Sequence, residues 1–259
     1  MTILYFTGTG NSLAVAKRIG GTLISIPQAI KNQEYEYTDD AIGIIFPTYC
    51  MYPPKIVRKF LGKSRLKADY FFAVATYGNR LGKGGDGSEM KEFDMIAEKC
   101  GYKFQYLNSI LMVDNFIDVF DIEKEIRNIP DKKIEEHLNK IIEDISEKKN
   151  YHKDPGYLGS MISNICRGLV RTQDRGLAAK KFLIHDSCVG CGVCTRLCPT
   201  GNIQLNSGRP HFGTNCQSCY ACINLCPQQA IYKKNEKSSS RWMNPEVTRE
   251  DIIRANCQL

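Results

Sequence analysis

The sequence predicts an α/β fold, a doubly wound parallel sheet, followed by a small α+β domain rich in cysteine. Apolar runs of strand length at residues 3–6, 41–46 and 70–75 each end in a polar or turn-forming loop, as central parallel strands do. Segments with helical apolar spacing alternate with them, which is typical of a doubly wound sheet. The chain of 259 residues exceeds one typical domain, and from about residue 181 it consists of short cysteine-rich segments.

The other elements follow from apolar periodicity and capping signals. A final helix is expected over 248–254, because Thr248 and Asp251 have the spacing of a capping box. The rest of the tail from residue 238 has no clear pattern that indicates a structure or a function. We expect further helices over 13–19, 54–61, 89–100 and about 131–149, and a strand near 106–113.

The domain boundaries are placed where the composition changes. Residues 1–154 are predicted to form the sheet domain, and residues 181–259 the cysteine-rich domain with its tail. Between them, 155–180 begins as a linker and continues as an amphipathic helix from Leu158 to about Arg171. The basic residues of that helix could lie on an anionic membrane, but its apolar stripe is short, so interdomain packing is favoured over membrane contact.

The composition is that of an ordinary globular protein, with 42% hydrophobic and 24% charged residues. No apolar run is long enough to span a bilayer, and no signal peptide precedes residues 3–6, so we expect a cytoplasmic protein. Thiols stay reduced in the cytoplasm. The twelve cysteines therefore indicate metal or redox chemistry rather than disulfides.

The formal net charge of +7 is uneven, since residues 151–259 carry 14 basic and 7 acidic residues. A basic half can indicate nucleic-acid binding. The cysteines of this half offer a simpler account, because metal centres held by several thiolates carry a net negative charge. We therefore expect no nucleic-acid partner.

Two segments repeat one cysteine pattern 28 residues apart. In each segment two residues separate the first cysteine from the second and the second from the third. A fourth cysteine follows after three intervening residues and stands directly before a proline. This is the bacterial spacing for two 4Fe–4S clusters, in which the fourth cysteine of each run binds the other cluster. The expected ligands are Cys188, Cys191, Cys194 and Cys226 for the first cluster, and Cys216, Cys219, Cys222 and Cys198 for the second.

Structural zinc is the rival interpretation. Zinc sites normally use two separated Cys-x-x-Cys knuckles, which two triple-cysteine runs followed by proline do not match. The remaining cysteines are most simply ordinary thiols, although Cys50 lies in a loop where chemistry is expected. They are Cys50, Cys100, Cys166 and Cys257.

The loop after the first strand has the features of an anion site. It connects a strand to a helix N-terminus, and its hydroxyl, amide and glycine residues suit a phosphate monoester. Neither a Walker lysine nor a Gly-x-Gly-x-x-Gly pattern is present, so an ATPase or a nicotinamide-binding unit is not indicated. The alternatives are a plain tight turn or a site for another phosphate. The residues are Thr7, Gly8, Thr9, Gly10, Asn11 and Ser12.

This loop resembles the phosphate loop of flavodoxins, which hold FMN. By that resemblance the loops after the next two strands enclose the flavin ring, with Tyr49 stacking on it and the backbone of residues 50–52 near its N5 atom. The glycine-rich run 82–87 departs from small flavodoxins and is either a cover over the flavin or a plain connection. The residues of the two loops are Pro47, Thr48, Tyr49, Cys50, Met51 and Tyr52, and Thr76, Tyr77, Gly78 and Asn79.

Nearly the whole chain resembles the EFR1-type flavodoxin–ferredoxin fusions of anaerobes. The resemblance rests on the phosphate loop, on the two cysteine runs preceded by Lys181-Phe182, and on the tail segment 244–247. It implies FMN and two 4Fe–4S clusters as cofactors. It also implies redox protein partners, either ferredoxin-like carriers or an oxidoreductase.

Three functions fit these motifs. The first is an electron-transfer iron–sulfur flavoprotein that moves electrons between low-potential one-electron carriers and FMN. The alternative is an FMN-dependent reductase of an unidentified small molecule, fed by its own ferredoxin domain, so enzymatic activity stays open. The third is a redox-sensing adaptor. If flavin and cluster lay beyond tunnelling range in one chain, a homodimer or a partner would have to close the gap.

Overall fold

The computed structural model describes residues 1–78, 88–153 and 176–259. The expected helix over 158–171, the glycine-rich run 82–87 and Asn79 lie outside these residues. Within the described part, no helix is both long enough and apolar enough to cross a membrane.

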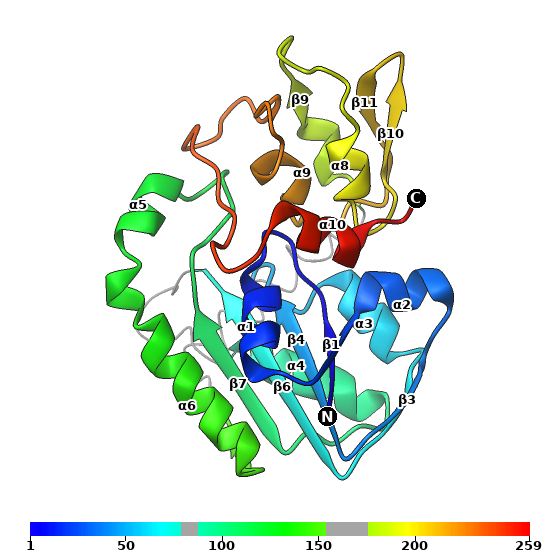
Figure 1. The fold of residues 1–259 in the computed structure, drawn as a ribbon, viewed down its shortest axis with the longest axis vertical. Coiled ribbons are helices and arrows are strands. Elements are labelled where there is room, and N and C mark those ends of the chain that lie inside the picture. Colours follow the sequence, from blue (N-terminus) through cyan, green and yellow to red (C-terminus); the bar gives the residue numbers. More distant parts are fainter. Residues whose placement is uncertain (79–87, 154–175) are drawn as a thin grey trace.

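The N-terminal domain is a parallel sheet with flavodoxin-like α/β topology, as the sequence predicts. Its six strands run in the order β2-β1-β4-β6-β7-β8, and every neighbouring pair is parallel. Helices α1 and α6 cover the face toward the viewer in Figure 1, and α4 lies behind the sheet. The strands of this sheet are β1 (Thr2–Tyr5), β2 (Thr22–Ser25), β4 (Ala41–Pro47), β6 (Tyr70–Tyr77), β7 (Tyr106–Leu111) and β8 (Tyr151–His152).

The predicted central strands are β1, β4 and β6, whose side chains are buried almost throughout. Burial on both faces is why these strands read as unbroken apolar runs. The sequence reading missed β2, α2 and the small parallel pair β3–β5, which are short and partly exposed. The other elements of this domain are α1 (Asn11–Ile19), α2 (Ile26–Asn32), β3 (Glu36–Thr38), α3 (Lys55–Leu61), β5 (Arg65–Lys67), α4 (Ser88–Lys99), α5 (Ile122–Arg127), η1 (Pro130–Lys132) and α6 (Ile134–Ser146).

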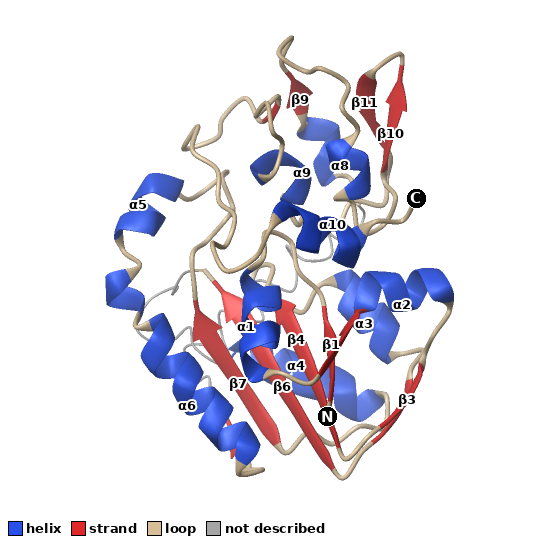
Figure 2. Ribbon diagram, in the orientation of Figure 1, coloured by secondary structure: helices blue, strands red, loops and turns tan. Residues whose placement is uncertain are grey.

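The cysteine-rich domain is ferredoxin-like and lies beyond the carboxyl ends of the sheet strands (Figure 2). It has two antiparallel strand pairs, β9–β12 and β10–β11, and a one-turn helix in each cysteine run. Its elements are η2 (Ala178–Lys181), β9 (Leu183–Ile184), α8 (Val193–Arg196), β10 (Ile203–Asn206), β11 (Arg209–Phe212), α9 (Ala221–Asn224) and β12 (Ile231–Tyr232).

The tail ends in helix α10 (Arg249–Asn256), which lies between the two domains (Figure 1). The predicted capping box is present: Thr248 Oγ1 accepts from the backbone N–H of Asp251, and the Asp251 carboxylate accepts from that of Thr248. Lys17 of α1 pairs with Asp251 at 2.9 Å, and Arg249 donates to the carbonyl of Leu225 in the ferredoxin-like domain. The tail therefore joins the two domains, a role that its sequence did not indicate.

Candidate cofactor site between the two domains

Four loops meet at the carboxyl ends of β1, β4, β6 and β7 and enclose a cavity of about 50 Å³. Open parallel sheets bind ligands at this edge, where the strand order reverses. The sequence predicted the first three loops. The cavity is lined by Thr7, Gly8, Thr9, Asn11, Ser12, Pro47, Thr48, Tyr49, Thr76, Tyr77, Gly78, Val113, Asp114 and Asn115.

The first loop presents its hydroxyl groups at the N-terminus of α1. Thr7 Oγ1 accepts from the backbone N–H of Gly10 at 3.2 Å, and the hydroxyls of Ser12 and Thr76 lie 2.8 Å apart. Thr7, Thr9 and Ser12 are all buried. Hydroxyl donors beside the positive end of a helix dipole suit an anion.

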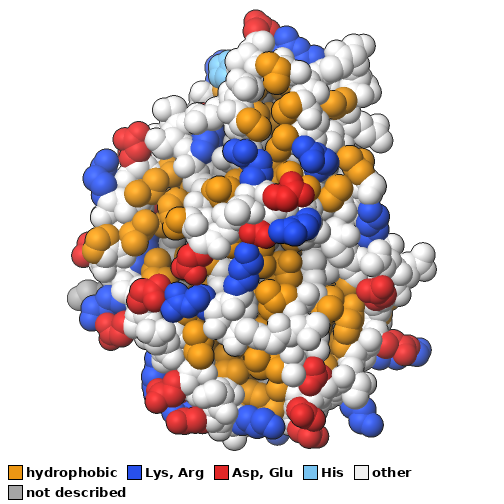
Figure 3. Space-filling model, viewed as in Figure 1, with side chains coloured by type: hydrophobic (Ala, Val, Ile, Leu, Met, Phe, Trp, Pro, Cys, Tyr) orange, Lys and Arg blue, Asp and Glu red, His pale blue; other side chains and the backbone are white. Residues whose placement is uncertain are grey.

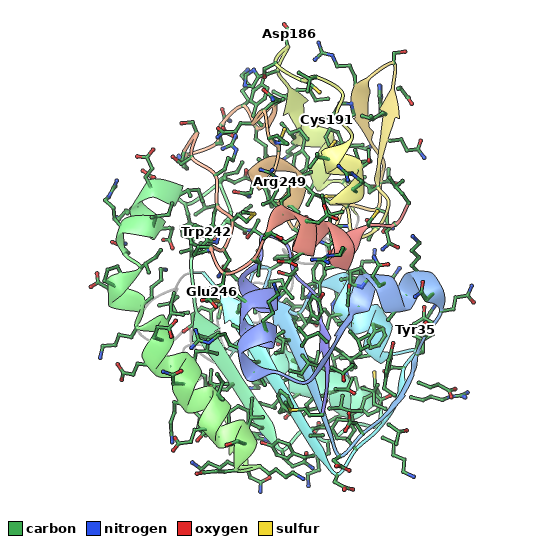
Figure 4. All side chains as sticks on the ribbon, in the orientation of Figure 1. Tyr35, Asp186, Cys191, Trp242, Glu246 and Arg249 are labelled. Carbon is green, nitrogen blue, oxygen red and sulfur yellow. The ribbon has the colours of Figure 1, made fainter. Side chains whose placement is uncertain are left out.

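Two residues of this loop also contact the C-terminal tail. The Asn11 side-chain amide donates to the carbonyl of Val113 at 2.9 Å, and its oxygen accepts from Trp242 Nε1 at 3.1 Å and from the Asn244 side chain at 3.2 Å. Gly10 does not line the cavity, and a Cβ there would lie 2.4 Å from Val247 Cγ2. Figure 4 labels Trp242 on the tail segment that approaches α1. The structure thus places Asn11 and Gly10 against the tail.

The second loop is a tight two-residue turn. Tyr49 and Tyr52 exchange both backbone hydrogen bonds, at 3.0 and 3.2 Å, and the residues between them, Cys50 and Met51, have φ of 50° and 59°. These are the dihedrals of a type I′ turn, which cost non-glycine residues roughly 1–2 kcal/mol each. Of the four, only Tyr49 lines the cavity.

The Tyr49 hydroxyl is buried and has no hydrogen-bond partner among the residues that the structure describes. Burial raises the pKa of Tyr49 well above its usual range, and the nearby thiols of Cys219 and Cys216 raise it further. The hydroxyl therefore stays protonated and is available as a donor.

The fourth loop, Val113 to Asn115, was missed by the sequence reading. The signal was available, because polar residues follow a predicted strand here as they do in the other three loops. Burial raises the pKa of the Asp114 carboxyl to about 6, and the neighbouring Glu125 adds to this rise. A Cβ on Gly78 would lie 2.3 Å from Asp114 Cβ, so only glycine lets the third and fourth loops pack this closely.

A buried ion pair supports these two loops. Lys132 Nζ lies 2.9 Å from Glu125 Oε2, with the side chains only 7% and 8% exposed, and it donates to the carbonyl of Gly78 at 3.1 Å. Glu125 Oε2 also accepts from the backbone N–H of Asp114 at 3.3 Å. Removing one partner of such a pair would leave an unpaired buried charge, so both side chains are needed for the observed packing of these loops.

The cysteines lie in two groups within the ferredoxin-like domain. A mostly apolar hollow is lined by the first three cysteines of the first run together with the fourth cysteine of the second. Burial, with contributions from the other three thiols of the group, raises the pKa of Cys194 to about 11. The members are Cys188, Cys191, Cys194 and Cys226.

The second group is more buried. Burial raises the pKa of Cys219 and Cys222 far above the usual thiol range, and their neighbours Cys216 and Cys198 contribute. Backbone N–H groups point at sulfur: that of Ser218 lies 3.3 Å from Cys216 Sγ. Such thiols become ligands only by losing a proton, which metal binding drives.

The zinc alternative is judged by ligand spacing. Among the residues that the structure describes, no group of three or more His, Cys, Asp or Glu side chains is placed to hold a single metal ion. Zinc sites normally use two separated Cys-x-x-Cys knuckles, whereas the bacterial spacing for 4Fe–4S clusters is a run of three cysteines with a fourth before a proline. The two cysteine runs of this chain have the second pattern.

The second cysteine loop rests on the cavity wall. A Cβ on Gly8 would lie 2.8 Å from the carbonyl oxygen of Cys219, and the Asn115 side chain donates both to that carbonyl, at 3.4 Å, and to Thr9 Oγ1, at 3.0 Å. Next to Cys219, the Gln217 side chain accepts from the backbone N–H of Ile56 at 3.0 Å, in the first turn of α3. The first and fourth loops of the cavity and the first turn of α3 thus contact the second cysteine loop directly.

Comparison with protein families identifies the two cysteine segments. Models of a 4Fe–4S binding domain match residues 182–204 and residues 214–233. The chain carries two 4Fe–4S binding motifs. No curated protein matches the chain as a whole. The motifs support an iron–sulfur electron-transfer role and redox partners. They do not cover the N-terminal cavity, whose role has to be inferred from its geometry.

Proposed function

We propose that this protein is an electron-transfer iron–sulfur flavoprotein, which passes electrons between one-electron carriers and FMN held in the four-loop cavity. The observation that carries the proposal is the contact between the two sites: the Cys219 carbonyl lies against Gly8 of the hydroxyl-rich loop. In this proposal the electron passes between the two sites within one chain.

The cysteine residues hold the clusters in this proposal. Each cluster takes the first three cysteines of one run and the fourth of the other, and supplies one-electron chemistry. The first group is Cys188, Cys191, Cys194 and Cys226, and the second is Cys198, Cys216, Cys219 and Cys222. Crossing of the fourth ligands ties the two runs together, and cluster binding adds to the folding energy of this small domain.

The cavity residues hold the flavin. The hydroxyls of Thr7, Thr9 and Ser12 at the α1 N-terminus suit the phosphate, and the loops carrying Tyr49 and Tyr77 flank the place for the ring. Sites for organic ligands usually measure about 300–1,000 Å³, so a cavity of about 50 Å³ admits FMN only if these two loops move apart. The strained type I′ turn is one place where the wall can change conformation.

The test is a preparation made without oxygen. We expect a brown protein with about eight iron atoms, eight sulfides and one FMN per chain. A preparation with iron but without FMN would contradict the flavin half, and a colourless one would contradict the whole proposal. As a sharper check, Ser12→Ala should release FMN more readily than the wild type while iron content stays constant, and Ser109→Ala in β7 is the matched control.

One observation favours the reductase alternative as a second candidate. The carboxyl of Asp114 lines the cavity and has a pKa of about 6, which suits a proton donor near neutral pH. The two functions separate in a single assay on the reduced protein. A carrier reduces viologen dyes or ferredoxin but no small metabolite, whereas a reductase shows saturable oxidation of its flavin by one metabolite.

A further inference from the structure

We propose that Tyr49, a residue of the N-terminal domain, donates a hydrogen bond to the second cluster and raises its reduction potential, and that Ser218 does the same from the cluster's own loop. This inference rests on the cluster half of the proposed function and is independent of the flavin half. It assigns to Tyr49 a role beyond stacking on a flavin.

The first observation is a pair of hydroxyls that lack partners. A buried hydroxyl without a hydrogen bond costs about 1–3 kcal/mol, so native structures leave few of them. Two of those in the described part of the chain lie at the second cysteine loop: Tyr49, whose hydroxyl lies beside Gly8 against which Cys219 packs, and Ser218, which lies between Cys216 and Cys219 in sequence. The full set of buried side-chain atoms without a partner is Tyr49 Oη, Ser109 Oγ, Ser218 Oγ, Arg241 Nε and Asn256 Oδ1.

The position of the Tyr49 hydroxyl follows from its neighbours. The point where a Gly8 Cβ would lie is 3.4 Å from Cys219 Cβ and 3.6 Å from the Tyr49 hydroxyl. The Tyr49 hydroxyl and the Cys219 side chain thus both lie beside Gly8, where the cavity wall meets the second cysteine loop. A cluster bound there brings thiolate and sulfide acceptors to a donor that the protein alone leaves unsatisfied.

The second observation is the backbone of Ser218. It has φ of 56°, in the left-handed region, and the residue at the same place in the first cysteine loop is Gly190, with φ of 66°. Glycine adopts this conformation without strain, whereas serine loses about 1–2 kcal/mol. A buried serine hydroxyl at a strained position, without a partner among the described residues, suits a donor to the sulfurs of a bound cluster.

The physical effect has a definite sign. Reduction adds one negative charge to a cluster, and a hydrogen bond to its sulfurs stabilises the more negative state. Donors therefore raise the potential. The first loop has Val189 and Gly190 where the second has Gln217 and Ser218, so it offers no hydroxyl at this place. The second cluster is thus tuned by contacts that the first one lacks.

The test is a redox titration of the whole protein, prepared without oxygen and followed by electron paramagnetic resonance. We expect Tyr49→Phe and Ser218→Gly each to lower the same one of the two cluster potentials. The ratio of reduced to oxidised cluster at a fixed applied potential should fall about tenfold, which is 59 mV for a one-electron couple. The other cluster should not change. Ser218→Gly should also raise the melting temperature, because it relieves the backbone strain.

The control is Ser109→Ala, which removes a buried unpartnered hydroxyl from β7 and should leave both potentials unchanged. The proposal is overturned if neither variant moves a potential, or if the two variants move different clusters. It is also overturned if Tyr49→Phe weakens FMN binding with both potentials intact, since the hydroxyl would then serve the flavin. A sample with clusters but no FMN would refute the flavin half of the proposed function and leave this test valid.

Discussion

The two cysteine loops share one ligand spacing but differ in everything around it. In the first loop Cys191 is exposed and Val189 is 68% exposed. Their counterparts 28 residues later are Cys219, which is buried against Gly8, and Gln217, which caps the first turn of α3. Figure 4 labels Cys191 in the upper domain, away from the sheet. The ligand pattern sets what each loop binds, and the residues between the ligands set where the loop lies.

The difference extends to the backbone. Gly190 and Gly192 of the first loop have positive φ, and the second loop places Ser218 and Tyr220 at the same two positions, both also with positive φ. Tyr220 uses its side chain to donate to the Asp118 carboxylate at 3.0 Å, on the N-terminal domain. The second loop therefore has non-glycine residues in a strained backbone conformation, and one of their side chains contacts the N-terminal domain.

The same contrast holds in the short helices α8 and α9. Arg196 of α8 corresponds to Asn224 of α9, and Asn224 is buried. Its oxygen accepts from the backbone N–H of Trp242 at 3.0 Å, and its amide donates to the carbonyl of Asn115 at 3.4 Å. On the face in Figure 3, Lys and Arg side chains gather across the middle of the molecule, with apolar side chains above them. Asn224 thus joins the second cysteine run to the N-terminal domain and to the tail.

The largest expected effect is that of removing one cluster ligand from either cysteine run, which should have different consequences for stability in the two runs. Cys222→Ala and Cys191→Ala should each remove about four of eight iron atoms. Only Cys222→Ala should also lower the melting temperature of the N-terminal domain, because its loop is part of the interface. Iron assays and thermal unfolding followed by circular dichroism measure both. Equal destabilisation by the two variants would show that the interface does not depend on the second loop.

The next effect concerns the close approach at Gly8. Gly8→Ala places a methyl group 2.8 Å from the backbone oxygen of Cys219, which cannot turn away, and should cost about 1–3 kcal/mol of unfolding free energy. The matched control is Gly62→Ala at the end of α3, where the nearest atom is 3.6 Å away and φ is −68°. Denaturant unfolding compares them. A neutral Gly8→Ala would mean that the two domains are not held this closely.

The fourth loop is expected to show a pH dependence. Because the pKa of Asp114 is about 6 in the folded protein against 3.8 ordinarily, the folded state binds more protons between these values, and stability falls as pH rises from about 4 to 6. Asp114→Asn should therefore stabilise the protein by about 3 kcal/mol at most above pH 6 and by little below pH 4. Unfolding free energies across this range test it, and a variant that is destabilised at neutral pH would contradict it.

The smallest expected effect is the loss of unfolding free energy when the hydrogen bond between Gln217 and the first turn of α3 is removed. Gln217→Ala removes the acceptor for the backbone N–H of Ile56 and should cost about 1 kcal/mol. Val189→Ala, its counterpart in the first loop, should change the free energy of unfolding by less than about 0.5 kcal/mol, because the side chain is exposed. If both variants behaved alike, the asymmetry between the loops would carry no energy at this position.

Features that depend on local pattern were predictable. The buried strands β1, β4 and β6 show as apolar runs, and the cap of α10 shows as the pair Thr248 and Asp251. The two cysteine runs are recognised by spacing alone, since ligand geometry requires it. Three of the four cavity loops follow from their position after these strands.

Features that depend on contacts between distant residues were not predictable. The tail pairs Asn244 with Thr9 and Asn256 with Thr7, each more than 200 positions away in the chain, so no local pattern reveals them. The exposure of one cysteine loop and the burial of the other likewise follow from packing against Gly8 and Ile56. The sequence by itself determined the kinds of element and the ligand set, because periodicity and spacing are local. Only the tertiary structure decided which loop meets the cavity, because that depends on how two separately patterned domains fit together.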